Sequence, residues 1–189
     1  MISFRPAGTV LIAGLLSLPA LVLAGTCEQL PGFTHLYNSG WGNGLENSRF
    51  QSQSAINRGN VSQLQLEWAF ALDENQSPHS YPVITGDTLF IGTTNGNLHA
   101  LDRDSGCVRW TYSAEEQIRT GIAYGRVVDA TGEERNLLFF GTFAGNVFAV
   151  DGVNGELVWK ADVKDHAYIM VTGTPTFHEG NLYVPISSG

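Results

Sequence analysis

Short apolar runs separated by turn residues fill the second half of the chain. The runs are rich in β-branched and aromatic residues, and they form two matching sets of three: LFIGT (89–93), LHALD (98–102) and CVRWTY (107–112), then LFFGT (138–142), VFAVD (147–151) and ELVWKA (156–161). The stretches between the runs contain Gly and Asn, which tolerate the positive φ of hairpin turns. The pattern therefore predicts antiparallel strands joined by tight turns.

The two sets form an internal repeat, because residues 89–112 and 138–161 align in register. Both contain the pattern A-x-D-x-x-x-G-x-x-x-W. With YPVI (81–84) or TPTF (174–177) as a leading strand, such a unit becomes a four-stranded antiparallel meander. A repeat of this kind predicts the blades of a β-propeller.

The residues shared by the two units are expected to have structural roles. The turn glycines permit unusual backbone angles, and the aspartates, Asp102 and Asp151, can accept hydrogen bonds from the turn that follows. The small Ala100 and Ala149 allow a neighbouring sheet to approach closely. The final tryptophans, Trp110 and Trp159, are large enough to wedge between blades.

The flanking sequence predicts that the propeller in this chain is partial. LQLEWAF (64–70) carries Trp68 at the last-strand position without preceding strands, and LYVPISSG (182–189) begins another unit. We therefore expect an all-β fold: one orphan strand, two full blades and the front half of a third. A closed propeller has about four to eight blades.

The first 24 residues have a different composition. Arg5 precedes an apolar, small-residue stretch that ends at Ala24, which predicts a secretory signal peptide and a periplasmic protein. A retained membrane anchor is the alternative, although the apolar run is short for a stable span. The organisation expected is a signal at 1–24, an N-terminal segment at 25–63 and the incomplete propeller at 64–189.

Composition narrows the possible functions. The 189 residues include 22 glycines and carry a net charge of −8, which argues against nucleic acid and anionic lipid as partners. Cys27 and Cys107 could form one disulfide in an oxidising compartment, or remain two buried thiols. The chain contains no H-E-x-x-H, G-x-S-x-G or P-loop motif.

The repeat resembles the tryptophan-docking motif of the pyrroloquinoline quinone (PQQ) dehydrogenases. Residues 41–70, WGNGLENSRFQSQSAINRGNVSQLQLEWAF, are similar to the opening of that family, above all its polyvinyl alcohol dehydrogenase branch. The resemblance implies an eight-bladed propeller when complete, with PQQ and a calcium ion near the axis. It also implies oxidation of an alcohol, with a polymeric secondary alcohol such as polyvinyl alcohol as a candidate, and transfer of electrons to a cytochrome c.

The resemblance also implies cofactor-binding residues. IRTGIAYG (118–125) is similar to the segment whose arginine contacts a PQQ carboxylate, which nominates Arg119. The alternative for Arg119 is a surface or interblade salt bridge. VTGTP (171–175) is similar to the segment with a PQQ-contacting threonine, which nominates Thr172, with Thr174 as a substitute. Either threonine could instead be satisfied by strand backbone.

The resemblance nominates three further residues, Ser187, Ser188 and His79, and one region departs from the family pattern. Ser187 and Ser188 match a stretch of cofactor-contacting Ser and Gly, and the family's calcium-binding glutamate and catalytic aspartate would lie beyond Gly189. His79 stands three residues before Pro82, where methanol-type enzymes have a glutamate; an exposed loop histidine is the alternative. Glu115-Glu116 occupies the region where many members have adjacent cysteines.

Two functions from different classes follow. The chain is expected to be the N-terminal part of a periplasmic PQQ-dependent alcohol dehydrogenase, inactive and self-associating when alone. The alternative is a cofactor-free propeller that acts as an assembly scaffold at the outer membrane, as some proteins with the same repeat do.

Overall fold

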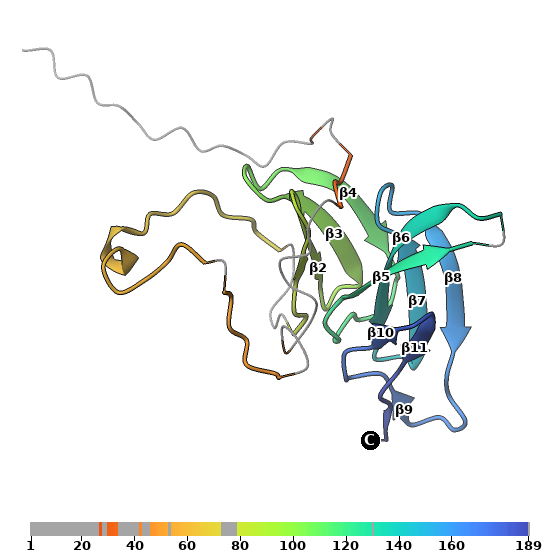
Figure 1. The fold of residues 1–189 in the computed structure, drawn as a ribbon. Helices are drawn as coiled ribbons and strands as arrows, with labels where there is room; N and C mark the ends of the chain where they lie inside the picture. Colours follow the sequence, from red (N-terminus) through yellow and green to blue (C-terminus); the bar gives the residue numbers. More distant parts are fainter. Residues whose placement is uncertain are drawn as a thin grey trace, which may run out of the picture.

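The computed structural model describes residues 27, 30–33, 42, 46–52, 54–72, 79–129 and 131–188. The predicted signal peptide and Gly189 lie outside these ranges. The described residues form β-strands and one short 3₁₀ helix, η1 (Val61–Gln63), and the sheets stand side by side as separate layers (Figure 1). No helix within the described ranges is long and apolar enough to cross a membrane.

The first blade is a four-stranded antiparallel meander with the order β1-β2-β3-β4. Its strands are β1 (Val83–Ile84), β2 (Thr88–Gly92), β3 (Asn97–Asp102) and β4 (Val108–Ser113). Phe90 pairs with Ala100, which pairs with Trp110, and a bulge follows Ala100. The predicted strands and their hairpin order are confirmed.

The second blade repeats this architecture in the order β5-β6-β7-β8. Its strands are β5 (Ala123–Val128), β6 (Glu134–Gly141), β7 (Asn146–Asp151) and β8 (Leu157–Asp162). The pairing of the first blade recurs here: Phe139 pairs with Ala149, which pairs with Trp159. The bulge also recurs, after Ala149. The internal repeat of the sequence is therefore also a repeat of three-dimensional structure, and it includes the bulge.

The start of a third unit follows the second blade. The hairpin of β10 (Thr176–His178) and β11 (Asn181–Tyr183) corresponds to the front half of a blade. Beside it, β9 (Ile169–Met170) pairs with β12 (Ser187–Ser188). The partial propeller is confirmed. Residues 64–70 form no ladder with a described residue, so the strand predicted there to complete a blade stays a prediction.

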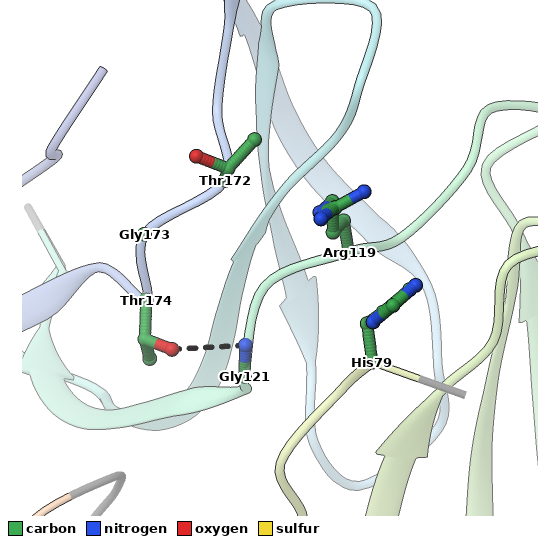
Figure 2. A pocket seen from close by; sticks show the side chains of 6 residues that line it. All are labelled: His79, Arg119, Gly121, Thr172, Gly173 and Thr174. Atoms are coloured by element: carbon green, nitrogen blue, oxygen red, sulfur yellow. Dashed lines mark hydrogen bonds between the residues drawn. The ribbon is translucent and has the colours of Figure 1, made fainter. Parts of the chain in front are cut away.

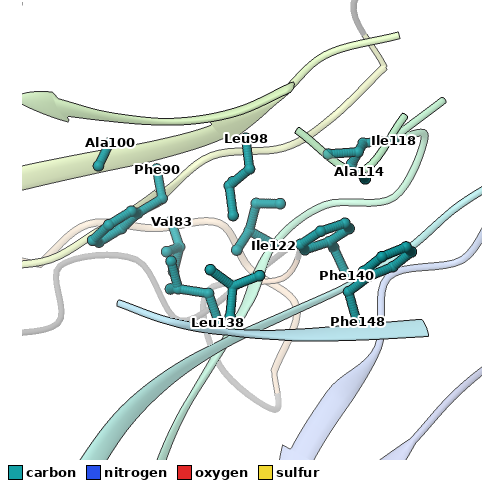
Figure 3. Packing of buried hydrophobic residues seen from close by; sticks show 11 residues of the cluster. Val83, Phe90, Leu98, Ala100, Ala114, Ile118, Ile122, Leu138, Phe140 and Phe148 are labelled. Atoms are coloured by element: carbon teal, nitrogen blue, oxygen red, sulfur yellow. The ribbon is translucent and has the colours of Figure 1, made fainter. Parts of the chain in front are cut away.

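The main core lies between the first two blades. Side chains from β2 and β3 meet side chains from β6 and β7, and residues of the connection between the blades fill the space between them (Figure 3). The buried members of the cluster are Val83, Phe90, Leu98, Ala100, Ala114, Ile118, Ile122, Leu138, Phe140, Phe148 and Val150. Every residue of β7 is buried, because this strand is covered on both faces.

Tryptophans connect successive units, as predicted for Trp110. The Trp68 indole nitrogen donates to the Arg103 carbonyl at 2.8 Å, and its ring covers Gly106. Trp110 donates to the Gly152 carbonyl at 3.3 Å, and its ring covers Gly155. A Cβ on Gly155 would lie 2.7 Å from the Trp110 ring, so this contact requires glycine.

The repeat aspartates organise the turns, also as predicted. Asp102 accepts from the Ser105 amide at 2.7 Å, and Asp151 accepts from the Val153 amide at 2.9 Å. Asp102 also pairs with the buried Arg109 guanidinium at 2.6 Å. Burial raises the pKa of Asp102, but the hydrogen bonds from Ser105 and the pair with Arg109 outweigh it and lower the pKa to about 2.

The N-terminal segment is fastened to the first blade. Cys27 and Cys107 form a disulfide, which settles the pairing that the sequence left open. The Gly32 amide donates to the Asp87 carboxylate at 2.7 Å. Phe33 then stacks on Phe90 of the first blade and on Tyr124 of the second, with ring centroids 5.8 and 5.7 Å away. The segment therefore spans the junction of the two blades.

Candidate cofactor site

One open cavity of about 420 Å³ lies where the blade connections meet. It is lined by His79, Arg119, Gly121, Thr172, Gly173 and Thr174. These residues come from three separate stretches of the chain, and Figure 2 shows the connections that carry them. The structure thus brings His79, Arg119 and Thr172, each nominated separately from sequence, to one cavity.

The connection between the blades positions Arg119. The amide of Ile118 donates to Thr93 of the first blade at 3.1 Å, and Ile118 bridges Thr142 of the second. Ile118 and Thr120 are both buried, so the extended backbone directs the intervening Arg119 outwards. Attachment to both blades fixes the base of this side chain.

The Arg119 guanidinium faces the cavity beside the His79 ring (Figure 2). Its carbon lies 5.6 Å from the centroid of the Phe143 ring, which is a cation–π contact. Among the described residues it forms no ion pair and no hydrogen bond. The salt-bridge alternative for Arg119 therefore finds no partner in the described part of the chain, and the positive charge is available to a ligand.

The two threonines differ in what their hydroxyls do. Thr174 accepts a hydrogen bond from the Gly121 amide at 2.9 Å, which ties two walls of the cavity together (Figure 2). Thr172 instead meets the Ser187 hydroxyl at 3.0 Å. Thr174 thus accepts from the backbone and keeps its own O–H to donate, whereas the Thr172 and Ser187 hydroxyls form a polar pair at the edge of the cavity.

The two nominated serines also differ in their relation to the cavity. The pairing of β12 with β9 brings Ser187 to Thr172. Ser188, the next residue in an extended strand, is exposed and does not line the cavity. The structure therefore connects Ser187 to the site through Thr172 and leaves Ser188 outside it.

Glu116 is a residue near the site to which the sequence analysis assigned no role. Its carboxylate accepts from the Thr142 hydroxyl at 2.6 Å and from the Asn146 amide at 2.9 Å, and it pairs with Lys160. Burial raises the pKa of Glu116, but the bonds from Lys160, Thr142 and Asn146 outweigh it and lower the pKa. The only signal in the sequence was the departure at Glu115-Glu116 itself.

The donors at this cavity suit an anion that carries a carboxylate. A guanidinium offers paired N–H donors that match a carboxylate, and the neighbouring imidazole and hydroxyls add single donors. Within the described ranges no three His, Cys, Asp or Glu side chains gather as a metal site would require. The Arg119 guanidinium in the cavity lining can bind a carboxylate.

Fold and site together define a class: a segment of a β-propeller with a polar cavity, lined by an arginine, where its blades meet. Residues 39–160 match the model of a PQQ family described as the β-propeller domain of glucose, ethanol and alcohol dehydrogenases. The chain belongs to this family, and the resemblance drawn from the tryptophan-docking repeat is confirmed.

Curated relatives are consistent with this membership. Polyvinylalcohol dehydrogenases from Pseudomonas sp. and from Sphingopyxis sp. are each 33% identical over 80% of this chain. The dehydrogenase subunit of the quinone-dependent alcohol dehydrogenase of Gluconobacter oxydans is 26% identical over 76% of it. The chain spans about a quarter of the length of these relatives, which is 23% for the first two.

Solved structures show the same fold. A europium-containing methanol dehydrogenase superposes with a TM-score of 0.68 at 22% identity, covering 82% of this chain and 28% of the other. The quinohemoprotein alcohol dehydrogenase from Comamonas testosteroni gives 0.67 at 20% identity, covering 83% and 24%. The all-β propeller architecture is therefore established by the family model, the strand order and these structures together.

Proposed function

We propose that this chain supplies part of the PQQ site of a periplasmic alcohol dehydrogenase. The observation that carries the proposal is the Arg119 guanidinium, which faces the cavity beside His79 and Thr172 without an ion pair among the described residues. A cation held in this way stabilises a bound carboxylate. PQQ is a flat tricarboxylate, so the donors present fit it.

The residues of this chain have separable tasks in the proposal. Arg119 binds a carboxylate, Thr172 and His79 offer hydrogen bonds that orient the ligand, and the Gly121–Thr174 bond keeps the walls together. Ser187 holds the Thr172 hydroxyl in place. PQQ, when bound, accepts the electrons of the oxidised alcohol, and the calcium ligands and the catalytic base are expected beyond residue 189.

The substrate, acceptor and compartment are parts of the same proposal. Identity of 33% with two polyvinylalcohol dehydrogenases supports a polymeric secondary alcohol such as polyvinyl alcohol as the substrate. A relative described as a cytochrome c-linked 1-butanol dehydrogenase supports a cytochrome c as acceptor. The apolar N-terminal stretch of residues 7–24 and the Cys27–Cys107 disulfide support export to the periplasm.

The test is PQQ binding to the full-length gene product, with and without calcium, measured by calorimetry. Arg119→Gln should weaken binding roughly 10- to 100-fold, because a hydrogen bond to a charged group contributes about 1.5–3 kcal/mol. Arg126→Gln is the matched control, since Arg126 is an exposed arginine paired with Glu134 and does not line the cavity. Its affinity should be unchanged.

The outcomes separate the two classes of function. Tight PQQ binding, together with reduction of a dye acceptor in the presence of polyvinyl alcohol, supports the dehydrogenase. Failure of the wild-type full-length protein to bind PQQ would contradict it and favour a scaffold. Equal binding by Arg119→Gln and Arg126→Gln would mean that the ligand lies elsewhere.

A further inference from the structure

The structure assigns Glu116 a positioning role: its carboxylate fixes the surface against which the Arg119 side chain rests. This inference rests on the proposed function and extends it to a residue that does not line the cavity. The contacts that carry it are those between the blade connection and the turn that joins β6 to β7, residues 142–146.

Glu116 fastens that turn from one side. Its carboxylate binds the Thr142 hydroxyl and the Asn146 side-chain amide, the residues that begin and end the turn. Thr142 is completely buried and Asn146 is 7% exposed, so water cannot readily replace the carboxylate. Lys160 on β8 pairs with the same carboxylate, so that β8 is also linked to Glu116. Glu116, Thr142, Asn146 and Lys160 together form the Glu116 cluster.

The backbone fastens the same turn next to Glu116. The Phe143 amide donates to the Gln117 carbonyl at 3.0 Å, and Ile118 bridges Thr142. Arg119 follows at once and lays its guanidinium over the Phe143 ring. The turn thus presents Phe143 as a platform for Arg119, while Glu116 holds both ends of the turn.

The chemistry of the cluster requires an ionised carboxylate. All three partners of Glu116 donate: a hydroxyl, an amide N–H and an ammonium. Glutamine has nearly the same shape but offers one acceptor oxygen, and its NH₂ group would face donors. Glu116→Gln should therefore loosen the turn and release Phe143 and Arg119 from their present geometry.

The neighbouring residue provides a matched control. Glu115 is exposed, and the change Glu115→Gln removes the same charge one position away. A general effect of net charge on an anionic ligand would appear in both variants. A loss of PQQ affinity confined to Glu116→Gln would come from the contacts of Glu116 with Thr142, Asn146 and Lys160.

The experiment is a double-mutant cycle on PQQ affinity in the full-length protein, with Glu116→Gln, Arg119→Gln and the pair combined. We expect Glu116→Gln to weaken PQQ roughly tenfold and Glu115→Gln to leave it unchanged. In the Arg119→Gln background the Glu116→Gln change should cost little more, because Glu116 acts through Arg119. Thermal unfolding of each variant without PQQ shows how much protein is folded at the assay temperature.

Each result bears on one idea. Equal affinities for Glu116→Gln and Glu115→Gln, or losses that add fully in the double variant, would overturn the positioning role. Thr142→Val, which removes one donor to the carboxylate, gives a second route if Glu116→Gln does not fold, and it should show the same non-additivity. Absence of PQQ binding by the wild type would instead count against the proposed function.

Discussion

The Cys27–Cys107 disulfide provides the sharpest test of how the N-terminal segment is held. The perturbation is the double variant Cys27→Ser, Cys107→Ser, which removes the bond without leaving a free thiol. The bond closes a loop with a sequence separation of 80 residues. Loop-closure entropy for that length corresponds to about 4.5 kcal/mol of the free energy of unfolding.

The other contacts of the N-terminal segment do not depend on the disulfide, so the native structure should change little in the double-serine variant. The Gly32–Asp87 hydrogen bond and the Phe33 stacks keep the segment docked. The disulfide therefore acts mainly on the unfolded chain, and we expect a loss of about 3–4.5 kcal/mol. Urea unfolding followed by tryptophan fluorescence measures this loss.

Reductant supplies the control. Dithiothreitol should lower the stability of the wild type to that of the double-serine variant and leave the variant itself unchanged. The reasoning is refuted if non-reduced, denatured protein alkylates at both cysteines in intact-mass analysis. It is also refuted if the bond is present but the variant loses less than about 1 kcal/mol.

Two further predictions concern the repeat. Gly155→Ala should lower the free energy of unfolding by about 2–4 kcal/mol, because a Cβ would meet the Trp110 ring at 2.7 Å and φ is +76°. Gly132→Ala, with φ +87° but open space around it, should cost only about 1–2 kcal/mol, and equal losses in urea melts would contradict the docking argument. Asp102, whose pKa falls from 3.8 to about 2, should contribute about 2 kcal/mol of stability that is fully present above pH 4 and lost as the pH falls to about 2. Arg109→Met should make this acid limb of the pH–stability profile shallower but not abolish it, because hydrogen bonds from Ser105 also lower the Asp102 pKa. An unchanged slope would show that the ion pair does not contribute to the shift.

The blades could be predicted from the sequence because their determinants are local. Each strand and turn is specified within a few residues, and the match between residues 89–112 and 138–161 made the blade visible twice. Trp68, which was predicted at the last-strand position, contacts the next unit as Trp110 does. The strand predicted at residues 64–70 stays a prediction, because no described residue pairs with it and a strand requires a partner that no local pattern can supply.

The site could be predicted only in part. Arg119, His79 and Thr172 were nominated from family resemblance, and the structure supplies their meeting at one cavity. Glu116 was missed because its partners, Thr142, Asn146 and Lys160, are 26, 30 and 44 positions away. A side chain whose role comes from distant donors has no local signature.

The tryptophan links also determine how such a molecule can grow. Trp68 and Trp110 bind carbonyls only 35 and 42 positions later in the chain, each in the next unit. Each of these two junctions can therefore close soon after its second partner leaves the ribosome, so that the blades they join can assemble in the order of synthesis. Because each tryptophan contacts the unit that follows it, duplication of one unit in the gene also duplicates the tryptophan that joins it to the next. The number of blades can then change without redesign of the blades already present.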